Sequence, residues 1–67
     1  MIVLSKLMRD FIKAQDSVEK FAERVGVSRQ TVYNLLSGEQ VSSDMMSKLV
    51  EATGITLDNG FEVRDGE

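Results

Sequence analysis

The polar side chains near the middle of the chain are the ones whose types and spacing suggest a chemical task. Arg29 and Gln30 are followed by Tyr33 and Asn34, a spacing that places all four on one side of a helix. Arginine and glutamine pair bidentately with guanine and adenine edges in the major groove of DNA. A cation in the first turn of a helix opposes the helix dipole, which destabilises the helix by about 0.3–1 kcal/mol. The preference reverses if that end of the helix must face an anion. We therefore predict that Arg29 and Gln30 read base edges; the alternative is two solvated residues on an exposed turn.

Tyr33 and several small polar residues surround this pair. We group Tyr33 with the base-reading residues, at a thymine methyl group or a phosphate, although covering the helix edge is an equal alternative. Gln40 lies near the start of a further predicted helix, where free N–H groups can receive a phosphate. The serines have an alternative role, because serine is also a common helix N-cap. Contacts with the DNA backbone are predicted for Ser28, Thr31, Asn34, Gln40 and Ser42.

Two short amphipathic helices must hold these side chains in place. The apolar spacing predicts the first over residues 18–25 and the second over residues 29–36. Gly26 ends the first helix, because glycine adopts the left-handed backbone conformation without a steric penalty. The N-cap of the first helix is either Ser17 or, one position earlier and with capping-box spacing, Asp16.

The two helices and their turn resemble the helix-turn-helix of the phage-repressor family of DNA-binding domains, the lambda repressor and Cro type. The segment VSSDMMSKLVEATGITL resembles the fourth helix of that family, so the resemblance covers residues 3–57. One departure is Val18, where the family often has a glutamine that contacts phosphate, which puts that contact in doubt. The resemblance is carried by a small residue between the helices, a glycine in the turn and five apolar positions: Ala22, Gly26, Phe21, Val25, Val27, Val32 and Leu35.

The resemblance implies sequence-specific binding of duplex DNA, with the third helix in the major groove. The protein would be a small transcriptional regulator, most simply a Cro-like repressor of a phage or prophage in the cytoplasm. A lone helix-turn-helix reads few base pairs, so a homodimer on a palindromic operator is expected. The alternative is a protein-interaction module, antitoxin-like or anti-repressor, that keeps the fold but uses an acidic face.

Two further helices complete the predicted fold. Apolar residues at helical spacing predict one helix over residues 3–14; the alternative is a strand over residues 1–4 before a shorter helix. Another helix is predicted over residues 43–53, with Ser42 or Ser43 as its N-cap. The predicted shared core consists of Leu7, Phe11, Phe21, Ala22, Val25, Val32, Leu35, Leu49 and Val50.

The C-terminal segment departs from the family, which commonly has a fifth helix there. The Asp-Asn-Gly run at residues 58–60 suits a three-residue hairpin loop with a left-handed glycine. Residues 55–63 are therefore predicted to form a β-hairpin. Its apolar side chains Leu57, Phe61 and Val63 are expected to join two copies, unless the domain covers them itself. The predicted fold class is mainly α, a four-helix lambda-repressor-like helix-turn-helix domain with a short C-terminal β-hairpin.

Composition narrows the remaining classes. The 67 residues form one domain at most, with no His and no Cys, so neither a metal site nor a cofactor is predicted and an enzyme is not expected. No apolar run approaches the roughly 20 residues of a membrane span. The net charge of −3 is uneven, because residues 1–48 carry +1 and residues 49–67 carry −4. The last residues, 64–67, are expected to be a frayed end.

Overall fold

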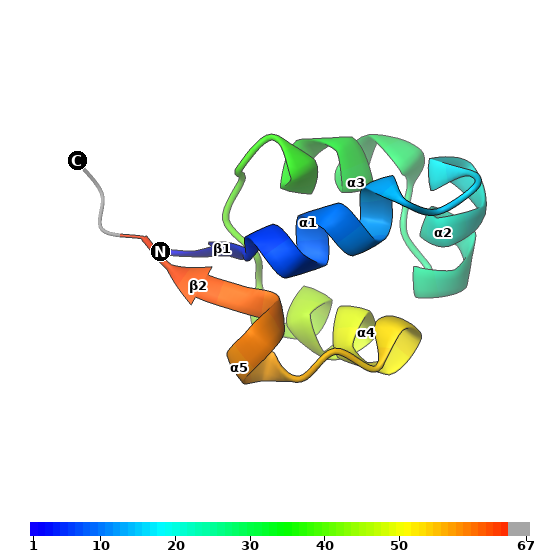
Figure 1. Cartoon of the computed structure of the whole chain (residues 1–67). Helices are drawn as coiled ribbons and strands as arrows, with labels where there is room; N and C mark the ends of the chain where they lie inside the picture. Colours follow the sequence, from blue (N-terminus) through cyan, green and yellow to red (C-terminus); the bar gives the residue numbers. More distant parts are fainter. Residues whose placement is uncertain (65–67) are drawn as a thin grey trace.

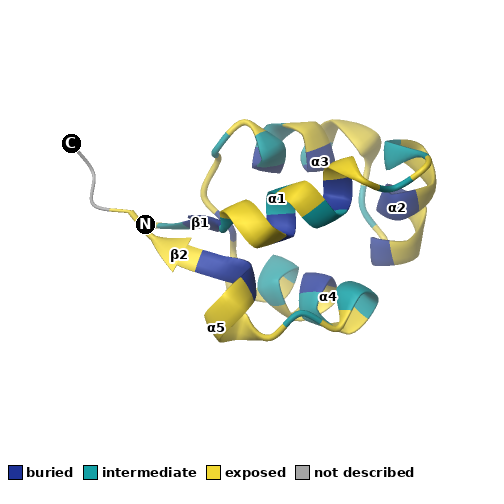
Figure 2. Cartoon of the chain, in the orientation of Figure 1, coloured by how far each residue is buried: buried dark blue, intermediate teal, exposed yellow. Residues whose placement is uncertain are grey.

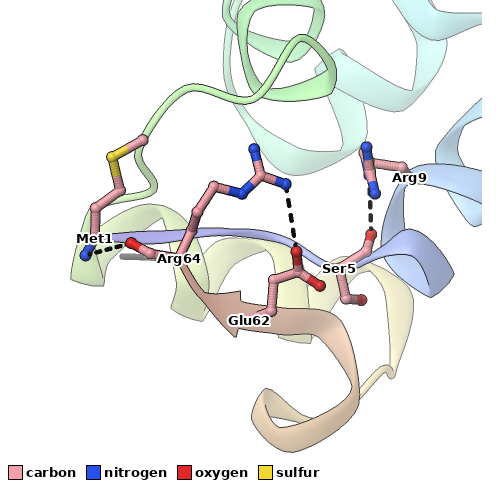
Figure 3. Close-up of polar contacts among 5 residues, drawn as sticks. All are labelled: Met1, Ser5, Arg9, Glu62 and Arg64. Carbon is pink, nitrogen blue, oxygen red and sulfur yellow. Dashed lines mark hydrogen bonds and ion pairs between the residues drawn. The ribbon is translucent and has the colours of Figure 1, made fainter. Parts of the chain in front are cut away.

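The two ends of the described chain, residues 1–64, pair with each other as a small antiparallel sheet in this computed structural model (Figure 1). Strand β1 (Ile2–Leu4) lies against strand β2 (Phe61–Val63), with Leu4 opposite Phe61. The N–H of Arg64 donates to the carbonyl of Met1 at 2.8 Å, and the terminal amino group of Met1 donates back to the Arg64 carbonyl at 3.3 Å (Figure 3). Arg64 is therefore held in place, contrary to the expected frayed end; the other three residues of that end lie outside the described residues.

Between the strands, the described residues form five helices. The three central helices have the predicted bounds, and their polar caps resolve the alternatives. The hydroxyl groups of Ser17 and Ser42 each accept a hydrogen bond at 3.2 Å from the backbone N–H three residues later, so these serines are the N-caps. The helices are α1 (Lys6–Lys13), α2 (Val18–Val25), α3 (Arg29–Leu36), α4 (Ser43–Thr53) and α5 (Leu57–Gly60).

The prediction of one helix over residues 3–14 was wrong, and the alternative of a strand followed by a shorter helix is confirmed. Ser5 caps α1 through a hydrogen bond from the N–H of Met8, so the helix begins after it. Met8 and Ile12 then face the core and are fully buried, whereas Leu7 is 54% exposed. Leu7 was wrongly placed in the core, because one residue turns a helix by about 100° and moves the side chain off the buried side.

The predicted C-terminal hairpin was also wrong. Residues 57–60 form a helical turn, and residues 61–63 pair with β1 instead of with residues 55–57. The hairpin required a left-handed Gly60, but Gly60 is not among the glycines with positive φ in the described chain. Gly60 is buried for a different reason: a Cβ there would lie 2.8 Å from the terminal methyl of Met8 and 3.2 Å from Cγ2 of Ile55. The small residue lets α5 approach α1 closely, and the apolar β1 provides a buried partner for β2.

The core lies where the helices meet the inner side of the sheet (Figure 2). Phe11 and Val50, two predicted core residues, are half-buried and pack against it. The N–H of Val41 donates to the Ile2 carbonyl at 2.8 Å, so the loop between α3 and α4 covers the outer edge of β1. The mainly α helix-turn-helix fold is thus confirmed, but the described residues add a short fifth helix to the four predicted, and the sheet joins β1 to β2 in place of the predicted C-terminal hairpin. The buried core consists of Val3, Leu4, Met8, Ile12, Phe21, Ala22, Val25, Val32, Leu35, Val41, Leu49 and Phe61.

Candidate DNA-binding surface

The turn between α2 and α3 fixes the direction of the candidate reading helix. Gly26 has a φ of 94°, a left-handed conformation that favours glycine, and the N–H of Gly26 donates to the Ala22 carbonyl at 2.8 Å. The N–H of Val27 donates to the same carbonyl at 2.9 Å. Ala22 is itself buried between the helices, together with Val25 and Val32. The apolar sides of α2 and α3 thus face inward, which leaves the polar side of α3 at the surface.

Arg29, Gln30 and Tyr33 are all exposed on α3, as predicted for side chains that must reach a ligand. Gln30 lies beside Asn34, since its Nε2 donates to Oδ1 of Asn34 at 3.0 Å. Tyr33 is 47% exposed, so about half of its surface remains accessible. The structure therefore brings the two predicted base-reading residues and Tyr33 together on one helix, with Asn34 bonded to one of them.

Ser28 and Ser42, two of the small polar residues near this helix, have clear structural roles. The Ser28 hydroxyl accepts from the N–H of Thr31 at 3.2 Å and lies 2.8 Å from the Thr31 hydroxyl. Ser28 is therefore the N-cap of α3, as Ser42 is of α4. Gln40 is exposed in the loop before α4. Contacts of these residues with the DNA backbone stay a prediction. Ser28 and Ser42 are needed for helix capping in any case.

Glu19 is the residue of this surface that the sequence analysis missed. Its Oε2 lies 3.3 Å from Nη1 of Arg29, an ion pair between α2 and α3. In the sequence, the position of Glu19 suggested only a capping box, since it lies three residues after Asp16. The signal available was an acidic residue in the first turn of one helix and a basic residue in the first turn of the next. Whether two such residues touch depends on how the helices cross.

The described residues offer neither a metal site nor a membrane span. Residues 1–64 contain no group of three or more Asp, Glu, His or Cys side chains placed to hold a metal ion. Over the same part of the chain, each helix is too short or too polar to cross a membrane.

Comparison with known protein families identifies the kind of domain that this chain forms. Residues 6–59 match the family model described as helix-turn-helix. Neither the curated proteins nor the solved structures contain a significant match to the chain. The match spans α1 to α4 and most of α5, and thus includes the turn at Gly26 and the exposed side of α3. The chain therefore belongs to the helix-turn-helix family of DNA-binding domains.

Proposed function

We propose that this protein is a Cro-like transcriptional repressor that binds one DNA sequence with α3 in the major groove. The observation that carries the proposal is the exposure of Arg29 and Gln30 at the first two positions of α3. In helix-turn-helix proteins the N-terminal residues of the recognition helix contact base edges. Arg29 fits a guanine and Gln30 an adenine, while Tyr33 lies one turn further on to meet a thymine methyl group or a phosphate.

Backbone contacts would flank the reading helix and fix its register. Ser28 caps α3, Thr31 lies in its first turn and Asn34 lies one turn later. Gln40 and Ser42 precede α4. A serine hydroxyl that accepts a backbone hydrogen bond still has its own hydrogen to donate to a phosphate. Such contacts position the protein on the duplex but do not select a sequence.

Arg29→Ala should weaken binding to the selected duplex by about 1–3 kcal/mol and should change binding to random DNA little. The duplex would first be obtained by selection from a random pool, and both affinities would then be measured by fluorescence anisotropy. Gln40→Ala is the matched comparison, because Gln40 is exposed and caps no helix. Gln40→Ala should weaken binding to the selected duplex and to random DNA about equally. If Arg29→Ala binds the selected duplex as tightly as the parent, α3 is not the reader.

The proposal includes a homodimer on a palindromic operator, formed through the edge of β2 that faces away from β1 and has no strand partner among residues 1–64. The Gly60 carbonyl accepts from the N–H of Ser5 at 3.0 Å and the Arg64 N–H donates to the Met1 carbonyl at 2.8 Å, so the backbone groups of Phe61 and Val63 alternate away from β1. Leu57 and Val63 are 57% and 74% exposed beside this edge. An open groove of about 430 Å³ lies there, lined by Ile2, Met46, Leu57, Asp58, Phe61, Glu62 and Val63. Phe61 is already buried in its own chain, so Leu57 and Val63 would supply most of the apolar contact.

Sedimentation of the protein at tens of micromolar should give twice the chain mass, and Val63→Asp should give the single mass. The introduced carboxylate would lie at the open edge, where strand pairing with a second copy would bury it. Circular dichroism should show that Val63→Asp keeps its helices, because Val63 is exposed. If the parent protein sediments as a monomer and also binds a palindromic site as a monomer, this interface is refuted.

A protein-interaction module is the second candidate, since the segment from residue 49 onward carries −4. The selection from random duplex DNA separates the two candidates. An enriched sequence supports the repressor. The absence of enrichment, with a defined protein partner recovered instead, supports the interaction module.

A further inference from the structure

The carboxylate of Glu19 lies against the arginine that is proposed to read DNA. Glu19 is in the first turn of α2, Arg29 is the first residue of α3, and the two charged groups are 3.3 Å apart. We propose that Glu19 is a positioning residue that holds the Arg29 guanidinium in the orientation that recognises one guanine. This inference rests on the proposed function, and it assigns to Glu19 a role in specificity rather than in affinity.

The ion pair contributes little to folding. The side chains of Glu19 and Arg29 are 60–67% exposed, and exposed ion pairs contribute little to stability because water screens them. Arg29 also stands at the positive end of the α3 dipole, where a cation is disfavoured. Glu19 stands at the positive end of α2, where a carboxylate is favoured. The negative charge of Glu19 thus compensates Arg29 at a place where its own helix stabilises it.

The geometry leaves the guanidinium able to read a base. A guanidinium has five N–H donors in a planar fork, and the contact with Glu19 uses Nη1. Nη2 and Nε remain for the two guanine acceptors, O6 and N7. A long arginine side chain has many rotamers, and fixing one before DNA arrives reduces the entropy lost on binding. Gln30, held by Asn34, is restrained in the same way.

A carboxylate close to DNA weakens sequence-independent binding. Every duplex presents phosphates, which repel Glu19 whatever the base sequence is. A variant without this charge should therefore bind random DNA more tightly, yet it should discriminate less well at the base pair that Arg29 reads. A residue with only a structural role would not change discrimination at a single base pair.

The test compares Glu19→Gln with Glu23→Gln, which removes the same charge from an exposed position one turn further along α2. The base pair that Arg29 reads is first identified as the one that Arg29→Ala no longer distinguishes. Dissociation constants would then be measured for the selected duplex, for the same duplex changed at that base pair, and for random DNA. Glu19→Gln should lower discrimination at that base pair by about threefold to tenfold and should tighten binding to random DNA. Glu23→Gln should leave discrimination unchanged. In an Arg29→Ala background, Glu19→Gln should have no further effect on discrimination.

The outcomes separate this inference from the proposed function. If Arg29→Ala loses discrimination while Glu19→Gln keeps all of it, the positioning role is overturned and the reading role of α3 stands. If no duplex is selected, or if Arg29→Ala loses no discrimination, the proposed reader fails and the inference fails with it. Thermal melting of both glutamine variants should match the parent within a few degrees, which excludes a folding defect as the cause.

Discussion

Phe61→Ala should lower the free energy of unfolding by about 3–5 kcal/mol, a large share of the stability that a domain of this size can have. Phe61 is only 9% exposed and joins the core from β2, the last strand of the described chain. Truncating its ring leaves a cavity between the sheet and the helices. Urea denaturation followed by circular dichroism would measure the loss.

Val63→Ala is the control on the same strand. Val63 is 74% exposed, so at a protein concentration at which the chain is monomeric its truncation should change the free energy of unfolding by no more than about 0.5 kcal/mol. Equal stability of Phe61→Ala and the parent would show that β2 is not part of the core. A chain ended after Asp58 lacks Phe61 as well, so we expect it to be unfolded.

Met8→Ala should destabilise the protein by about 2–5 kcal/mol, while the neighbouring Leu7→Ala should have an effect within about 0.5 kcal/mol. Met8 is completely buried in α1, whereas more than half of Leu7 is exposed. Thermal denaturation of the two variants therefore reports which side of α1 faces the core. Similar losses for both would mean that α1 begins earlier and is rotated relative to the structure.

The central helices could be predicted because their signals are local. Ser17 and Ser42 cap α2 and α4 through N–H groups three residues away, and Gly26 and Gly54 end the same helices with positive φ. Each of these signals lies within one turn of the boundary that it sets. The bounds of α2 and α4 consequently agree with the prediction residue by residue.

The ends of the chain were harder to predict because their partners are distant in sequence. Ile2 pairs with Val63, and nothing in either segment alone identifies the other. Gly60 carried a misleading local signal, because it resembled a loop glycine although the absence of a side chain serves its contact with α1. The candidate site, too, could be predicted only in part. The exposure of Arg29 followed from the pattern of α3, but its contact with Glu19 depends on how α2 and α3 cross.

The pairing of β1 with β2 also determines when the protein can complete its fold during synthesis. The chain leaves the ribosome from its N-terminus at about 5–20 residues per second, and a domain folds once its parts are available. The contacts between α2 and α3 are close in sequence and can form early. The core lacks Phe61, and β1 lacks its partner, until the segment after α5 has emerged. A ribosome-bound chain that ends before β2 should therefore display a helix-turn-helix that is still sensitive to protease, and resistance should appear only when residues 61–64 leave the exit tunnel.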